Sequence, residues 1–221
     1  MSNDPPSKPP TGNAPASAND LARNRAGASL RKLAAEMIEK ETFLHYLRRI
    51  FSGHSQHRAW RRGAEGEEVV AKCLTPLEEA GWKVLHSVPI GEGEADIDHV
   101  VIGPSGVFTL NTKNHRGKRV TVYEHVIYVS GVKVPYIQKA RGEGKRATQR
   151  LSRALGKPIV VKPLIVVLAR DFRVKGHPNG VTVVPRRQIA SWLSKQSPVM
   201  SREEMAAVYH VARQRATWTS R

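Results

Sequence analysis

Two segments decide the fold, Ala95-Asp-Ile-Asp-His-Val-Val-Ile102 and Val107-Phe-Thr-Leu-Asn-Thr-Lys113, with only Gly103-Pro-Ser-Gly106 between them. Both segments alternate apolar and polar residues, as strands do when one face of a sheet is buried. The sequence between them is rich in turn-forming residues. Together the two segments predict a β-hairpin.

The short connection sets the register of this hairpin. If the four-residue turn joins the strands directly, Asp98 lies opposite Asn111. Asp96 then faces Lys113, and facing residues share one side of the sheet. Two carboxylates, an amide and an ammonium group would converge there, as in a site for a divalent metal ion and a phosphate. The alternative is a solvated sheet face with ordinary cross-strand ion pairs.

Composition limits the class of protein and of partner. The 221 residues suffice for one domain with appended segments, and 40% of them are hydrophobic. The net charge is +17, and residues 61–221 alone carry 27 Lys and Arg against 14 Asp and Glu. Such charge favours nucleic acid or an anionic membrane as partner, with a generally basic protein as the alternative. A single cysteine, no apolar run long enough to span a membrane and no export signal predict a cytoplasmic location.

The amino-terminal part of the chain predicts a tail followed by a helix. Residues 1–27 are rich in Pro, Ser, Ala, Asn and Gly, so we expect them to be disordered. Residues 28–59 predict an amphipathic helix, with apolar residues at seven-residue spacing over 29–51, and a linker at 52–58. Packing on the domain is the first expectation for this helix, ahead of homodimer formation and docking on a membrane surface.

The remaining chain predicts a domain over residues 60–195 and a helical extension over 196–221. Hydrophobic periodicity predicts helices over about 62–80, 135–155, 189–193 and 203–213. It predicts strands over about 82–89, 95–102, 107–113, 120–134, 164–168 and 181–184. The fold class is therefore α/β, an αβββαβ sandwich with a mixed central sheet, in which 164–168 is covered on both faces.

Three separated motifs occur in matching structural contexts. They are Gly63-Ala-Glu-Gly-Glu67 opening the first helix, Asp96-Ile-Asp-His-Val-Val-Ile-Gly-Pro-Ser-Gly-Val-Phe108 running into Asn111-Thr-Lys-Asn114, and Pro135-Tyr-Ile-Gln138 at the second helix. Together they resemble the nuclease-related domain (NERD) family over about residues 60–195, with agreement in order and spacing. The resemblance implies the restriction-endonuclease-like PD-(D/E)XK fold.

The resemblance also implies a catalytic metal site. In that superfamily a helical glutamate, a strand aspartate, an acid-x-lysine pair and a helical glutamine act together, and these roles fall on Glu67, Asp98, Asn111 with Lys113, and Gln138. The metal ligands would be Asp98, Asp96, Asn111 and Glu67, with Mg²⁺ or Mn²⁺ as cofactor. Asn111 departs from the pattern, which has an acid there, and Asp96 is expected to compensate. Structural alternatives are an exposed helix glutamate for Glu67 and a capping-region side chain for Gln138.

Basic residues around this site are expected to contact phosphates, with a solvated charged face as the alternative. They are Arg116, Lys118, Arg119, Arg141, Lys145, Arg146 and Arg150. Few aromatic residues interleave them, so stacking on single-stranded bases is not predicted. The expected function is metal-dependent hydrolysis of DNA with little sequence preference. The alternative is a weak or inactive nuclease fold that acts as a nucleic-acid-binding or assembly module.

Overall fold

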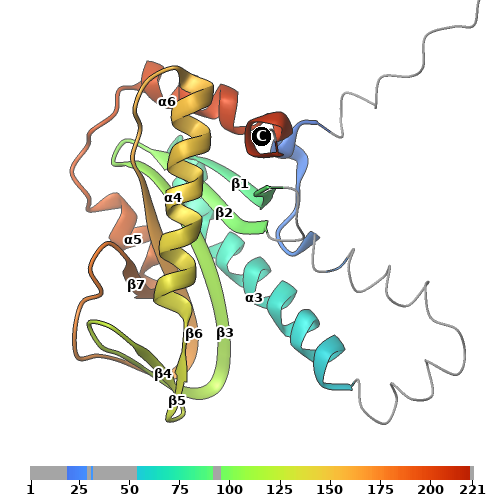
Figure 1. Ribbon diagram of the computed structural model, residues 1–221, viewed down its shortest axis with the longest axis vertical. Helices are drawn as coiled ribbons and strands as arrows, with labels where there is room; N and C mark the ends of the chain where they lie inside the picture. Colours follow the sequence, from blue (N-terminus) through green and yellow to red (C-terminus); the bar gives the residue numbers. More distant parts are fainter. Residues whose placement is uncertain (1–18, 29–30, 32–53, 92–95, 220–221) are drawn as a thin grey trace, which may run out of the picture.

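The computed structural model describes residues 19–28, 31, 54–91 and 96–219. They form one mixed sheet with helices on both faces (Figure 1). In chain order the elements are η2 (Leu21–Arg23), α3 (His54–Glu79), β1 (Lys83–Pro89), β2 (Asp96–Gly103), β3 (Gly106–Val122), β4 (Ile127–Val129), β5 (Val132–Val134), α4 (Tyr136–Leu155), β6 (Val161–Val174), β7 (Thr182–Pro185), η3 (Arg186–Gln188), α5 (Ile189–Ser194), α6 (Arg202–Ala212) and α7 (Arg215–Thr219).

The sheet is built around β3, its longest strand. One edge of β3 pairs antiparallel with β2 in its first part and with β4 in its last part. The other edge runs parallel to β6, which in turn pairs in parallel with β7. The mixed α/β sandwich predicted from the sequence is confirmed. The hairpin register is confirmed from Ile102 opposite Val107 to His99 opposite Leu110. The ladder ends there, so the expected pairs Asp98–Asn111 and Asp96–Lys113 do not form, because β2 and β3 diverge beyond His99.

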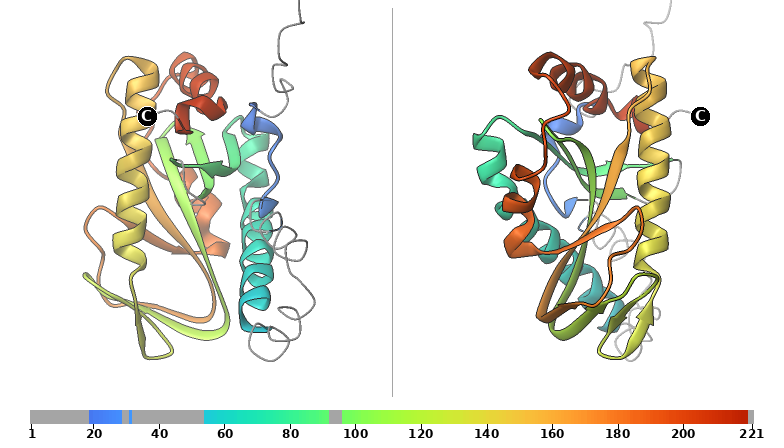
Figure 2. Two further views of the ribbon diagram at one scale, coloured as in Figure 1. Left: turned by 45° about the vertical axis from the view of Figure 1, so that its right-hand side comes forward. Right: turned by 90° about the vertical axis from the view of Figure 1, so that its left-hand side faces the viewer.

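Helices cover both faces of the sheet because its central strands are apolar on both faces. Residues 164–168 of β6 are all buried. Leu164 and Val166 belong to the core beneath α3 and α5, whereas Ile165 and Val167 belong to the core beneath α4. Figure 2 shows α4 on one side of the sheet and α3 with α5 on the other. An unbroken apolar run in a strand predicts this two-sided burial.

The amino-terminal segment differs from the disordered tail expected over residues 1–27. Residues 19–28 lie against the domain, where the Leu21 side chain is 1% exposed and packs in one cluster with Val88 and Trp218. The Leu21 N–H donates to the Arg213 carbonyl at 2.8 Å, and Asp20 forms an ion pair with Arg213. Burial of one large apolar side chain, with these polar contacts, offsets the entropy of ordering a segment of otherwise polar composition.

Other boundaries also move. The helix predicted from about residue 62 already begins at His54, so the expected linker is wrong from that residue onwards. Most of the predicted amphipathic helix, and with it the expected homodimer, lies outside the described residues. The helix predicted over 203–213 is present as α6, and α7 follows it without having been predicted. Met205, Val208 and Trp218 of these helices are buried in one core cluster. None of the described helices is long and apolar enough to cross a membrane.

Candidate active site

A fork between β2 and β3 creates the candidate site. The ladder between these strands ends where His99 lies opposite Leu110. Beyond that point β2 stays paired with β1 as far as Asp96, whereas β3 follows β6 through Asn111 and Lys113. The strands therefore diverge at the polar residues that the sequence singles out. Because β3 has no neighbouring strand on this edge beyond Leu110, its backbone groups there can bind side chains instead.

Asp98 occupies the fork. Its Oδ2 accepts the backbone N–H of Thr112 at 2.5 Å, where a regular ladder would supply a backbone carbonyl. Burial raises the pKa of Asp98 to about 6, although the Lys113 ammonium and the Thr112 N–H act in the opposite direction. This half-buried carboxylate can therefore gain or lose a proton near neutral pH.

Asn111 is held by a carboxylate from the opposite layer. Its amide nitrogen Nδ2 donates to both carboxylate oxygens of Glu143 in α4, at 2.9 and 2.8 Å. The Asn111 carbonyl oxygen Oδ1 is buried and has no hydrogen-bond partner among the described residues. The Glu143 charge also contributes to the raised pKa of Asp98. An acid thus stands beside Asn111, supplied by the helix and not by the strand.

Glu67 reaches the cluster from α3. Its side chain is buried, and Oε2 accepts the backbone N–H of Gly27 at 2.9 Å. Burial, followed by the negative charge of Asp98, raises the pKa of Glu67 to about 8. In the metal-free protein this carboxyl is therefore mostly protonated at neutral pH. The alternative reading of Glu67 as an exposed helix glutamate is wrong.

Two glycines allow both helices to approach the sheet where the acids are placed. A Cβ on Gly66, next to Glu67, would lie 2.9 Å from the Cβ of Asn114. A Cβ on Gly144, next to Glu143, would lie 3.1 Å from the Pro163 ring. Glu67 follows Gly66, and Glu143 precedes Gly144. At each of these glycines only a hydrogen atom fits without displacing the neighbouring side chain.

Lys113 is positioned at the rim by an aromatic side chain. Its Nζ lies 5.1 Å from the centroid of the Tyr136 ring, a cation–π distance. The Tyr136 ring stacks on His115, and the Tyr136 hydroxyl lies 2.9 Å from the His115 Nε2. The Lys113 charge lowers the pKa of both Asp98 and Glu67, so the ammonium acts on both carboxyls.

Two expected site residues have weaker connections to this cluster. Asp96 is half-buried and contributes through its charge to the raised pKa of Glu67. Gln138 is exposed in the first turn of α4. It precedes Glu143 by five positions, or about 140° around the helix, so it points away from the side that meets Asn111. Metal binding by Asp96 and catalysis by Gln138 stay predictions.

Comparison with known proteins finds one matching family model. Residues 62–168 match the family model described as "Nuclease-related domain". The stretch that carries the cluster is thus similar to a nuclease-related domain. This NERD family falls in the PD-(D/E)XK class, as the sequence motifs predict. The match begins within α3 and ends within β6. It includes every residue of the cluster except Gly27.

A second comparison gives a shorter match. The chain is 39% identical over 59 residues to an uncharacterized protein of Bacillus anthracis. The aligned stretch covers 25% of this chain and 28% of that protein. The chain thus matches little more than a quarter of that relative's length. No solved structure matches the chain.

The basic residues expected around the nuclease-related site divide into two groups. Arg119 pairs with Asp171 at 2.7 Å, and the Arg141 guanidinium donates to the Asn179 carbonyl. The other five residues are exposed or half-buried on the strand rim and on α4, and they are Arg116, Lys118, Lys145, Arg146 and Arg150. The expectation that they contact phosphates stays a prediction.

Sequence reasoning missed Glu143 and Tyr136 as members of the site. Glu143 is the single acidic residue of α4, within a segment that carries six Lys or Arg. It also lies three residues after Ala140 and four before Ala147, both on the buried side of the helix. A lone acid on the inward side of a basic helix is a signal that could have identified it. Tyr136, seven residues earlier, lies on the same side.

Proposed function

We propose that this nuclease-related domain hydrolyses phosphodiester bonds of DNA in a metal-dependent reaction with little sequence preference. One observation carries the proposal, namely the convergence of three carboxyl groups and one ammonium group at the strand fork beside Asn111, whose buried Oδ1 has no hydrogen-bond partner within the described residues. The contributing residues are Glu67, Asp98, Glu143 and Lys113.

The donor set at the fork suits a hard divalent cation such as Mg²⁺ or Mn²⁺. The Asp98 carboxylate and Asn111 Oδ1 are oxygen donors, and the second is a buried acceptor without a partner in the described chain. Mg²⁺ commonly binds through one or two carboxylates and completes its shell with water and substrate phosphate oxygens. Within the described ranges no three His, Cys, Asp or Glu side chains form a ready metal cage. When bound, the ion would polarise the scissile phosphate and lower the pKa of the attacking water.

The protein side chains have separate roles in this proposal. Lys113 orients the attacking water or stabilises negative charge that develops on the phosphate. Glu143 fixes the Asn111 amide through both of its carboxylate oxygens, so that Oδ1 stays directed away from the helix. Glu67, whose pKa of about 8 lies close to neutral pH, can release or accept a proton at the site. Tyr136 keeps the Lys113 ammonium at the rim.

The second candidate is a domain that binds nucleic acid without cutting it. It is favoured by the uncharged Asn111, because an amide oxygen holds Mg²⁺ more weakly than a carboxylate does. The net charge of +17 serves binding equally well in both cases. The two candidates differ in whether Asp98 matters for turnover.

A cleavage assay separates the two candidates. The full chain is incubated with linear, circular and single-stranded DNA in Mg²⁺ or Mn²⁺, beside Asp98→Asn and Lys113→Ala. We expect each substitution to reduce the rate at least about 100-fold, as removal of one catalytic group commonly does. Glu79→Gln and Lys195→Ala are the matched controls, because both residues are exposed and lie outside the cluster.

The outcomes are distinct. Cutting that is unchanged in Asp98→Asn and Lys113→Ala would reject the proposed site. Salt-sensitive DNA binding without any cutting by the native chain would favour the binding module. Absence of DNA binding at low salt would reject both candidates.

A further inference from the structure

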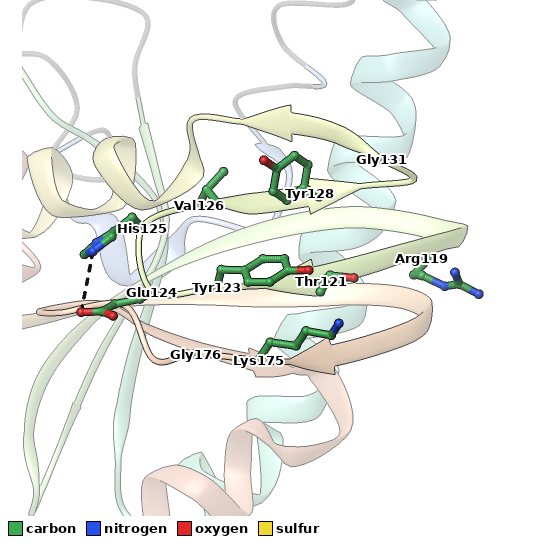
Figure 3. Close-up of a pocket in the computed structure, with 10 residues that line it drawn as sticks. All are labelled: Arg119, Thr121, Tyr123, Glu124, His125, Val126, Tyr128, Gly131, Lys175 and Gly176. Atoms are coloured by element: carbon green, nitrogen blue, oxygen red, sulfur yellow. Dashed lines mark ion pairs between the residues drawn. The ribbon is translucent and has the colours of Figure 1, made fainter.

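A pocket lies at the far end of β3 from the fork, and the proposed reaction does not use it (Figure 3). Its volume is about 840 Å³. The side chains that matter most are Arg119 and Tyr123 at the end of β3, Tyr128 on β4, and Lys175 just after β6. Segments that are distant in the sequence thus bring two tyrosines and two cations to one hollow.

Strand alternation puts these side chains on one face of the sheet. Thr121 of β3 pairs with Tyr128 of β4 on one edge and with Arg173 of β6 on the other. The intervening Val120 and Val122 belong instead to the core that includes Ile137 of α4. The pocket is therefore on the sheet face opposite α4.

The two tyrosines offer an aromatic surface. Their ring centroids are 5.8 Å apart and the ring planes are at 85°, an edge-to-face arrangement. Tyr123 is 37% exposed. The Lys175 Nζ lies 5.8 Å from the centroid of the Tyr123 ring, so a cation is held beside the aromatic face. Figure 3 shows both rings and the Lys175 amine along the same hollow.

The surroundings of the tyrosines carry an excess of positive charge. Arg119 and Arg173 share one carboxylate, that of Asp171, at 2.7 and 3.2 Å. Lys133 pairs with Tyr128 across β4 and β5 and so lies on the same face. Opposing charge comes from Glu124, whose carboxylate lies 3.8 Å from the His125 imidazole. Four cationic side chains thus accompany the carboxylates of Asp171 and Glu124.

We propose that this pocket binds single-stranded nucleic acid, with a base stacked on Tyr123 and Tyr128 and a neighbouring phosphate on Lys175. Aromatic side chains within a cationic groove are the usual means of binding single strands without sequence preference. Few aromatic residues accompany the basic ones in the sequence, but the fold brings Tyr123 and Tyr128 next to Arg119 and Lys175.

Both the pocket and the fork involve residues of β3, at two places along the strand. From Lys113 to Tyr123 the chain advances ten residues, a span of about 30 Å at the rise of a β-strand. Arg116 and Lys118 are exposed between these two points. The pocket faces away from α4, whereas Asn111 and Lys113 meet α4, so a single strand held at the tyrosines would reach the fork by crossing the β3 edge between the β2 and β4 ladders. In this respect the inference rests on the proposed function.

Binding is tested with the full chain in EDTA, so that cutting cannot interfere. A fluorescent oligothymidylate of about ten nucleotides, within the usual site size, is titrated with native protein, Tyr123→Leu and Tyr123→Phe. We expect Tyr123→Leu to weaken binding roughly 5- to 150-fold, the loss that removal of one stacked base gives, and Tyr123→Phe to retain it. Lys175→Gln should weaken binding and reduce the salt dependence, whereas Lys195→Gln, which removes an exposed lysine elsewhere, should not.

An abasic oligomer of equal length and charge separates stacking from charge. Native protein should bind it about as weakly as Tyr123→Leu binds oligothymidylate. Equal affinity of native protein and Tyr123→Leu for oligothymidylate, with both folded by circular dichroism, would overturn the inference. So would equal affinity of native protein for the abasic and base-containing oligomers.

Failure here is distinguishable from failure of the proposed function. Glu79→Gln, at an exposed position outside both the fork and the pocket, should bind the oligomer as native protein does. If Asp98→Asn abolishes cutting while Tyr123→Leu leaves binding unchanged, the proposed function stands and the inference is rejected. If native protein never cuts yet Tyr123→Leu loses binding, the reverse holds.

Discussion

Among single residues, Asn111 and Glu143 divide a task that one strand acid is expected to perform. Asn111 provides a buried oxygen at the strand position, and Glu143 provides the negative charge from α4, with the two side chains joined at 2.8 and 2.9 Å. Glu143 is thus a second source of charge beside Asp96, whose expected compensation for Asn111 stays a prediction. The Glu143 carboxylate comes from α4, which is separated from β3 by β4 and β5 along the chain, yet it reaches the strand position of Asn111.

This division predicts the outcome of exchanging the two side chains. In EDTA, Asn111→Asp would place two carboxylates against each other and remove the amide donor, at a cost of about 2–4 kcal/mol. Combining it with Glu143→Gln restores an amide facing an acid and should recover most of that free energy. Chemical denaturation of both single variants and the double variant gives the coupling energy. Additive effects of the two substitutions would contradict the pairing.

The raised pKa of Glu67 predicts how stability depends on pH. Its pKa is about 8 in the folded protein against 4.5 for the unperturbed group, so the folded state holds a proton that the unfolded state has lost between these values. This contribution to stability is fully present below pH 4.5 and is lost as the pH rises through 8, with a slope approaching about 1.4 kcal/mol per pH unit. Glu67→Gln keeps a neutral acceptor for Gly27, so it should match native protein at pH 5 and exceed its stability at pH 9.

Unfolding free energies measured in EDTA across this range test the pH effect. Glu79→Gln, at an exposed position of the same helix, should keep the native slope. A native slope retained in Glu67→Gln would assign the pH dependence to other groups, with Asp98 the first to consider because its pKa is about 6.

Among the elements, short-range patterns predict the hairpin and the presence of the strands, although β3 continues to Val122 and β6 spans Val161–Val174. Contacts between layers account for what these patterns miss. The Asp98, Asn111 and Lys113 set follows from alternation and a four-residue turn alone. Glu143 does not, because its role depends on how α4 lies across β3, and no periodicity within α4 specifies that angle. Leu21 was missed for a related reason. A single apolar residue in a polar stretch gives no periodic signal, and its burial depends on contacts with residues distant in the sequence.

The glycines on either side of Glu143 predict opposite effects of alanine in one helix. A Cβ on Gly142 would meet only the end of the Arg146 side chain, at 3.4 Å, so Gly142→Ala should stabilise the protein by about 0.5–1 kcal/mol through helix propensity. A Cβ on Gly144 would press on the Pro163 ring at 3.1 Å. Gly144→Ala should therefore destabilise the protein by about 1 kcal/mol or more.

Thermal unfolding of the two glycine variants at one pH measures this difference, and each variant controls for the propensity gain of the other. Equal stabilisation by both would mean that α4 can move away from β6. In that case Gly144→Ala should also disturb the Asn111–Glu143 contact and lower cleavage, which the same samples can report.

In the whole molecule, the segment 19–28 meets the carboxyl-terminal helices and connects with the site. Asp20 contacts Arg213 of the carboxyl-terminal part, and the backbone between Leu21 and Gly27 continues to the N–H that binds Glu67. The Asn24 side chain donates to the Ser87 carbonyl, and the Ser87 hydroxyl donates to the Arg25 carbonyl, which fixes the path along β1. The segment therefore covers Glu67 where the Gly27 N–H binds its carboxyl group.

Leu21→Ala tests whether this cover matters. Loss of a fully buried leucine should cost about 2–5 kcal/mol. If the segment then detaches, water reaches Glu67, and its pKa should fall because burial is the largest cause of the raised value. The slope of stability between pH 5 and pH 9 should shrink as well. Ala22→Gly, at the exposed neighbouring residue, controls for a change in the segment that leaves the core intact. A variant that loses stability but keeps the full slope would show that Leu21 supports the core without covering Glu67.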